Sequence, residues 1–288
     1  METVGVLTDT TASIPAALAA ELGIELVPYY VIREGQTLHD MLDVRPEPFA
    51  RYLETASTLP TTSNPSPGDY FVGLQRLAER TREIVALTMT SKGSGGYQSC
   101  LAAVELVKEH LPRVRVEVID TLAVAMSQGW AAIEAARSAR LGQSLGEVAA
   151  RARQVAARAT LIMTADTLRY LYMGGRIGRA QRLLGSLLDI KPIIGMDEGV
   201  ITALGTARTR ARAYARMIEL ARQKVGEGAR LRVAYLHVAA LEQLAALRAG
   251  FERAFQCVEE ITTPLSPALA VHSGPGTVGL SFVEEQWT

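Results

Sequence analysis

The chain has 288 residues, which corresponds to one large domain or two of ordinary size. Hydrophobic residues make up 48%, enough for a sizeable core, and Lys plus Arg equal Asp plus Glu at 30 each. This balance leaves no net field to attract nucleic acid or an anionic membrane. The two cysteines, Cys100 and Cys257, cannot form a disulfide framework, and no Cys/His cluster has metal-site spacing.

The N-terminal segment has no pattern of a secretory signal. An apolar run begins at Val4, and no basic region precedes it. No stretch of about 20 apolar residues is present to cross a bilayer. We therefore expect a cytoplasmic protein that uses neither a metal nor a cofactor and does not bind nucleic acid.

The first half alternates between apolar runs and helical patterns. Ser13 is the predicted N-cap of its first helix, and Ser66-Pro67-Gly68-Asp69 has the pattern of a helix start. This alternation predicts a parallel sheet in a Rossmann-like α/β domain. The predicted strands are 4–8, 24–32, 83–90 and 114–120, and the predicted helices begin near Pro15, Pro67 and Tyr97.

The second half has a different pattern, with a hairpin turn at Asp197-Glu198-Gly199. A hairpin combined with helices indicates a smaller α/β domain with antiparallel strands. We place the boundary near residue 160, giving domains 1–160 and 161–288, with strand exchange between them allowed. The predicted helices are 167–173, 181–188, one from about Arg208, and 240–254, and the predicted strands are 231–238, 256–263 and 268–283.

A glycine-rich segment, TSKGSGGYQS (90–99), leaves a buried strand and enters a helix. Ligands of open α/β sheets bind outside such strand ends, and the helix start offers free N–H groups to an anion. Ser91 and Ser94 add hydroxyl donors. The simpler interpretation is a capped turn with Ser94 as the N-cap, and no GK[ST] makes the segment a Walker A loop.

Two further motifs lie in the second half. HSGPGTVG (272–279) contains a formal G-x-G-x-x-G but leads into a strand, so it is not a dinucleotide fingerprint. His272 beside it is either a packed structural histidine or a functional residue of a site. In YMGGRIGR (172–179), Arg176 follows a double-glycine helix end and is either a surface charge or a fork for a carboxylate or phosphate.

The stretch LPTTSNPSP (59–67) combines hydroxyls with three prolines, which exclude a long helix or a central strand. It can be read as a linker, as a helix start at Ser66, or as part of a ligand site. The helix-start and ligand-site interpretations are compatible, because prolines would stiffen the segment that carries Thr61 and Thr62.

Two other functions stay open from the residues alone. Arg208, Arg212 and Arg216 share one helical face, which is either solvated or a docking surface for an acidic partner. Ser94, His272 and Asp9 could act as a hydrolase triad only if folding brings them together, and there is no G-x-S-x-G elbow.

Several of these segments together resemble the DegV family in order and spacing. The resemblance covers essentially the whole chain, and its strength comes from the motifs being in register. The segments are TDTTASIP (8–15), LPTTSNPSP (59–67), TSKGSGGYQS (90–99), VIDT (118–121), DTLRYLYMGGRI (166–177), IKPII (190–194) and HSGPGTVG (272–279).

The resemblance implies a Rossmann-like domain paired with a smaller α/β domain and a long-chain fatty acid held between them. It also implies a non-enzymatic role, in which the protein presents the carboxylate to a separate fatty acid kinase that makes an acyl-phosphate for phospholipid metabolism. Transient membrane contact fits this role, and we expect a monomer. The carboxylate ligands implied by the resemblance are Thr61, Thr62, Ser94, Arg176 and a protonated His272.

The sequence departs from the family pattern in two places. The glycine-rich loop is usually closer to S-S-x-L-S-G-T-Y, whereas this chain has Thr90, Gly93 and Gly96 at the first Ser, the Leu and the Thr. A usual D-S-K segment is here DTLAVAMSQG (120–129). The first departure would reshape the region near the head group, and the second would change contacts with the acyl chain.

Overall fold

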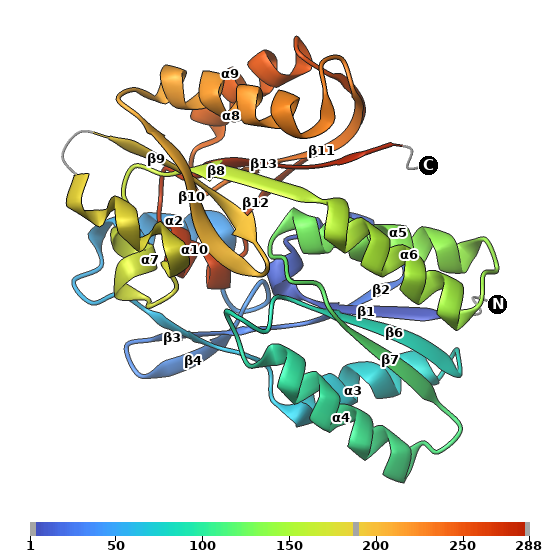
Figure 1. Cartoon of the computed structure of the whole chain (residues 1–288). Coiled ribbons are helices and arrows are strands. Elements are labelled where there is room, and N and C mark those ends of the chain that lie inside the picture. Colours follow the sequence, from blue (N-terminus) through green and yellow to red (C-terminus); the bar gives the residue numbers. More distant parts are fainter. Residues whose placement is uncertain (1–3, 187–189, 286–288) are drawn as a thin grey trace. The chain divides into compact units, whose positions relative to one another are not determined.

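The structure is a computed structural model that describes residues 4–186 and 190–285 (Figure 1). The chain forms two compact units. Unit 1 comprises Met1–Asp43 and Thr62–Ala159, and unit 2 comprises Val44–Thr61 and Thr160–Thr288. The segment Val44–Thr61 thus belongs to unit 2, whereas the predicted division at residue 160 assigned it to the first domain.

Unit 1 is built on a parallel sheet with strand order β2-β1-β6-β7. Its strands are β1 (Gly5–Asp9), β2 (Ile24–Val27), β6 (Glu83–Thr88) and β7 (Arg115–Asp120). Every residue of β1 is buried, and so are five of the six residues of β6, as expected for central strands that are covered on both faces. The predicted Rossmann-like architecture is confirmed.

Helices cover both faces of this sheet. On one face lie α3 (Pro67–Ala78) and α4 (Gly96–His110), and on the other α5 (Met126–Arg140) and α6 (Leu145–Arg158) (Figure 1). The predicted start of α3 is confirmed: Ser66 Oγ accepts from Asp69 N at 3.2 Å, and the Asp69 carboxylate accepts from Ser66 N at 2.7 Å. This is a capping box with proline at the first helical position.

Two predictions for the first 40 residues are wrong. Ser13 does not cap α1 (Ala16–Leu22); it ends the short 3-10 helix η1 (Thr10–Ala12) in the left-handed conformation, at φ 54°. The predicted strand 24–32 is two strands, because proline has no N–H to continue the ladder at Pro28. The second strand, β3 (Tyr30–Arg33), joins β4 (Gln36–His39) and β5 (Thr61–Ser63) in a separate sheet of order β4-β3-β5.

Unit 2 contains a six-stranded mixed sheet of order β10-β9-β8-β13-β11-β12, in which only β11 and β12 pair in parallel. The hairpin is confirmed, with Glu198 and Gly199 at positive φ in its turn. The strands are β8 (Thr160–Thr164), β9 (Lys191–Asp197), β10 (Val200–Ala207), β11 (Arg230–His237), β12 (Gln256–Pro264) and β13 (Val278–Glu284).

The helices of unit 2 include one that was predicted as strand. Residues 268–273 lie in α10 (Pro267–Ser273), which Ser266 caps, and the following strand begins only at Val278. The predicted helix 181–188 is part of the 3-10 helix η2 (Gly178–Ser186), and its residues 187 and 188 lie outside the described residues. The other helices are α2 (Pro46–Thr55), α7 (Arg169–Met173), α8 (Arg210–Val225) and α9 (Leu241–Glu252).

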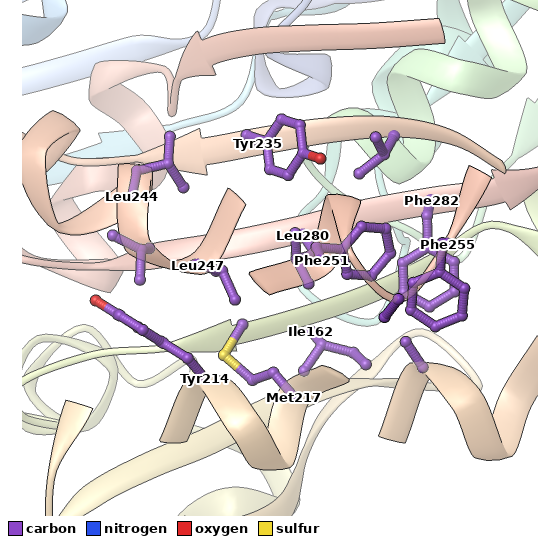
Figure 2. Close-up of a cluster of buried hydrophobic side chains, with 14 of the residues drawn as sticks. Ile162, Tyr214, Met217, Tyr235, Leu244, Leu247, Phe251, Phe255, Leu280 and Phe282 are labelled. Carbon is purple, nitrogen blue, oxygen red and sulfur yellow. The ribbon is translucent and has the colours of Figure 1, made fainter. Parts of the chain in front are cut away.

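The core of unit 2 lies between its sheet and helices α8 and α9 (Figure 2). Phe251 of α9 is fully buried, with its ring centroid 5.7 Å from Phe282 and 6.3 Å from Tyr235. These aromatic side chains bury large apolar areas and so contribute strongly to stability. Across residues 4–186 and 190–285, no helix combines the length and apolar character needed to cross a membrane.

Candidate functional site

The carboxyl end of β1 in unit 1 carries a buried carboxylate. Asp9 has no exposed surface, and it accepts hydrogen bonds from Thr11 N at 3.0 Å and Met89 N at 3.1 Å. Burial raises the pKa of Asp9 above its usual value, and hydrogen bonds from Thr11, Met89 and Gln128 offset part of that rise. These bonds join the ends of β1 and β6, so Asp9 fixes the sheet edge where a ligand would approach.

A second set of bonds fixes the turn between β2 and β3 to the same edge. Thr10 Oγ1 donates to Asp40 Oδ2 at 2.6 Å and accepts from Tyr29 N at 3.1 Å. Asp40 N in turn donates to Tyr29 O at 2.8 Å. The backbone of Tyr29 is therefore held on both sides.

Ser94 lies in the glycine-rich loop, directly before the start of α4. Its Oγ is 2.8 Å from Tyr29 Oη and accepts from Gly96 N at 3.4 Å. The N-cap position itself is Gly95, so Ser94 is not the cap of α4. The hydroxyl is partly buried and touches the phenol of a tyrosine from another segment.

The segment LPTTSNPSP is attached to the start of α4 through Asn64. The Asn64 Nδ2 amide donates to Ser99 Oγ at 2.9 Å. A Cβ on Gly95 would lie 2.9 Å from Asn64 Oδ1. Thr62, two residues earlier, is partly buried, and Thr61 is exposed. Thr62 and Ser94 are thus both in unit 1, on segments whose close approach Gly95 permits.

In unit 2, His272 of α10 lies against the end of α7. A Cβ on Gly174 would lie 2.3 Å from His272 Nδ1, so only glycine leaves room for the ring. Desolvation and, to a smaller extent, the positive charge of Arg176 together lower the pKa of His272 to about 4. His272 is therefore neutral at pH 7, contrary to the expected imidazolium.

Arg176 follows α7 and is exposed. Its backbone N donates to Leu171 O at 2.9 Å, and its Nη1 donates to Gly174 O at 2.7 Å. Gly175, which separates Gly174 from Arg176, takes the left-handed conformation at φ +68°, as expected for the end of a helix. Arg176 and His272 therefore belong to one local arrangement in unit 2.

The remaining candidates do not join these groups. Arg208, Arg212 and Arg216 are all exposed, but Arg208 precedes the helix, because Thr209 is the N-cap and accepts from Arg212 N. The predicted three-residue face is therefore reduced to Arg212 and Arg216. Within residues 4–186 and 190–285, no group of three His, Cys, Asp or Glu side chains could hold a metal ion.

The triad hypothesis finds no support in unit 1. The carboxylate of Asp9 is engaged by Thr11 and Met89 N, and Ser94 pairs with a tyrosine. A Ser-His-Asp triad requires the serine to meet the histidine that the acid orients. Ser94 is instead hydrogen-bonded to Tyr29, and Asp9 accepts from Thr11 N and Met89 N.

Sequence reasoning missed three residues of these arrangements, Tyr29, Asn64 and Gly174. Asn64 lies within LPTTSNPSP, and the pattern around Gly174 indicates only a helix end. The apolar pattern predicts that Tyr29 lies inside a continuous strand, although Pro28 before it signals a break. Its contact with Ser94 spans 65 residues of chain, so no local pattern could have revealed it.

Comparisons with known proteins all point to one family. A family model described as "Uncharacterised protein, DegV family" matches residues 3–285. A DegV domain-containing protein of Deinococcus radiodurans is 33% identical over 282 residues, covering 97% of this chain and 98% of that protein. Another from Clostridium perfringens is 29% identical, covering 98% and 99%.

Solved structures show the same relationship. A DegV family protein from Thermus thermophilus, described by its fatty acid binding, has a TM-score of 0.91 and 30% identity, covering 98% of this chain and 99% of that one. A DegV lipid-binding protein from Thermotoga maritima has a TM-score of 0.89 and 27% identity, covering 99% and 100%.

Proposed function

This chain belongs to the DegV family, and on that basis we propose that it binds a long-chain fatty acid. The observation that carries the proposal is its likeness, over nearly the whole chain, to a structure described by its fatty acid binding. The proposed ligands of the fatty acid carboxylate are Thr61, Thr62, Ser94, Arg176 and His272.

The chemistry of these side chains suits a carboxylate. An unpaired carboxylate in an apolar pocket costs several kcal/mol, so a protein that buries the acyl chain must solvate the head group. Hydroxyls donate hydrogen bonds, and Arg176 supplies the positive charge. His272, neutral at pH 7, offers a ring N–H rather than a charge.

The acyl tail supplies most of the gross affinity. Burial of each CH₂ is worth about 0.8 kcal/mol, so a palmitate-length tail gives roughly 10 kcal/mol before the cost of ordering the ligand. The head-group residues would then contribute orientation as well as affinity. An oriented carboxylate is what a separate kinase requires to form an acyl-phosphate.

We propose a fatty acid kinase as the partner, with the exposed pair Arg212 and Arg216 as a docking surface. The protein would act in the cytoplasm as a carrier that catalyses no reaction itself. Two arginines on one exposed helical face complement an acidic surface.

The first test is to identify what the purified protein holds. Native mass spectrometry followed by lipid extraction should show a long-chain fatty acid in about one copy per chain. Stripped protein should bind added fatty acid again. If no acyl species co-purifies and none binds on addition, the proposed function is wrong.

Alanine variants test the head-group residues against a matched surface arginine. Arg176→Ala should weaken fatty acid binding by about 1.5–3 kcal/mol, as for a lost charge-assisted hydrogen bond, and Ser94→Ala by about 1 kcal/mol. Arg216→Ala should leave binding unchanged and lower transfer to the kinase. Calorimetry and a phosphorylation assay measure the two effects; unchanged affinity in both head-group variants would contradict their roles.

The same preparation separates a carrier from a hydrolase. Incubation with an activated acyl ester should give stoichiometric binding without turnover. Turnover that disappears in Ser94→Ala would replace the carrier proposal with an enzyme that uses Ser94 and His272.

A further inference from the structure

The Tyr29 phenol lies within hydrogen-bonding distance of the Ser94 hydroxyl, and the two residues belong to distant segments of unit 1. Their oxygens are 2.8 Å apart, within the range of a good O–H···O hydrogen bond. Tyr29 is only 4% exposed, and Thr10 and Asp40 hold its backbone. The phenol is therefore a fixed group rather than a mobile surface side chain.

The contact between Tyr29 and Ser94 requires a residue without a side chain at position 96. A Cβ on Gly96 would lie 2.6 Å from Tyr29 Oη, closer than real Cβ contacts come. The first residue of a helix rarely needs glycine for its own conformation, and Gly96 has no positive φ. The absence of a side chain at Gly96 is thus explained by the phenol beside it.

Hydrogen-bond direction decides what Ser94 can do. A hydroxyl has one proton to donate and can accept two bonds. If Ser94 donates to Tyr29, no proton remains for a ligand. If Tyr29 donates, Ser94 accepts from Tyr29 and from Gly96 N and keeps its own proton for a third group. Burial holds the pKa of Tyr29 well above its usual value, so the phenol keeps its proton.

We propose that Tyr29 is a positioning residue, which donates to Ser94 and so directs the Ser94 proton at the carboxylate of the bound fatty acid. This inference rests on the proposed function. A carboxylate accepts hydrogen bonds but donates none, so its arrival selects the direction Tyr29 to Ser94 to carboxylate. Each bond in such a chain polarises the next, which strengthens the last one.

A neighbouring tyrosine provides a matched control. Tyr70 is fully buried, and a Cβ on Gly96 would lie 3.1 Å from its Oη. Within residues 4–186 and 190–285, its hydroxyl has no hydrogen-bond partner. Tyr70→Phe therefore removes a phenol oxygen from the same cluster without removing a bond to Ser94.

The test is a double-mutant cycle on fatty acid binding, measured by calorimetry with the delipidated full chain and palmitate. Tyr29→Phe should raise Kd about three- to fivefold, no more than Ser94→Ala does, and Tyr70→Phe should change it less than twofold. In the Ser94→Ala background, Tyr29→Phe should have no further effect. A merely structural role for Tyr29 would instead give additive losses.

Other outcomes overturn the inference. Tyr29→Phe with wild-type Kd, an equal loss in Tyr70→Phe, or additive losses in the cycle each contradict it. If Tyr29→Phe does not fold, Gly96→Ala must reproduce its effect, because the new methyl group would push the phenol off Ser94; wild-type Kd in Gly96→Ala then overturns it. Absence of palmitate binding by the wild-type chain overturns the proposed function as well.

Discussion

At the scale of single residues, His272 shows how packing changes chemistry. A histidine with its usual pKa would be partly charged just below neutral pH, but desolvation and the charge of Arg176 lower the pKa of His272 to about 4. The glycine at position 174 makes this packing compatible with the helix end. The ring is therefore a neutral hydrogen-bonding group at physiological pH.

The lowered pKa predicts a pH dependence of stability. As the pH falls from about 6.5 to 4, His272 becomes protonated in the unfolded protein but stays neutral in the folded protein. Unfolding therefore becomes more favourable. Urea denaturation should show that wild type loses ~2 kcal/mol more than His272→Asn between pH 7 and 4.5, after allowance for partial exposure of the ring. Parallel pH profiles of the two proteins would contradict this.

At the scale of elements, a local motif explains why the start of α3 could be predicted from the sequence, and the same motif begins α6, whose start is not among the predicted elements. Both α3 and α6 begin with a capping box, in which Ser66 pairs with Asp69 and Ser144 pairs with Glu147. In each, the serine hydroxyl accepts from a backbone N–H that the helix cannot satisfy, and the acid accepts from the serine N–H. These interactions involve residues three positions apart.

Removing either cap should destabilise the protein by a similar amount. We expect Ser66→Ala and Ser144→Ala each to lower the free energy of unfolding by about 1 kcal/mol, measured by urea denaturation at pH 7. The exposed Ser57→Ala serves as control and should stay within about 0.5 kcal/mol of wild type. If all three variants match wild type, the capping boxes do not stabilise their helices measurably.

The wrong element predictions have equally local causes. The run 24–32 is apolar enough for one strand, but Pro28 ends the ladder and sends β3 into another sheet. The stretch 268–273 is apolar like a strand, yet Ser266-Pro267 is a helix start, with Ser266 Oγ accepting from Leu269 N at 3.4 Å. In both places a breaker or cap outweighed hydrophobic composition.

At the scale of the whole molecule, the chain enters unit 2 twice. Val44–Thr61 supplies α2, whose Phe49 and Leu53 are each 2% exposed, and α2 packs on α10. Tyr170 Oη also donates to Leu53 O at 3.4 Å. Unit 2 is therefore incomplete without a segment that precedes it by a hundred residues.

This organisation predicts the behaviour of a fragment. Residues 160–288 alone should lack cooperative thermal unfolding by circular dichroism, because the surface of α10 that α2 covers would be exposed to water. Adding a peptide of residues 44–61 should restore a cooperative transition. The same peptide with Phe49→Ala and Leu53→Ala should not, and a fragment that unfolds cooperatively without any peptide would contradict the prediction.

The sequence by itself determined the alternation of strands and helices, the cap at Ser66, the hairpin turn at Glu198-Gly199 and the family resemblance. Each of these depends on neighbours within a few residues or on motifs in order. Only the tertiary structure decided that Val44–Thr61 completes unit 2, that Gly174 faces His272, and that Tyr29 meets Ser94. These contacts join segments far apart in the chain, and their strength comes from burial and close approach, which no local pattern encodes.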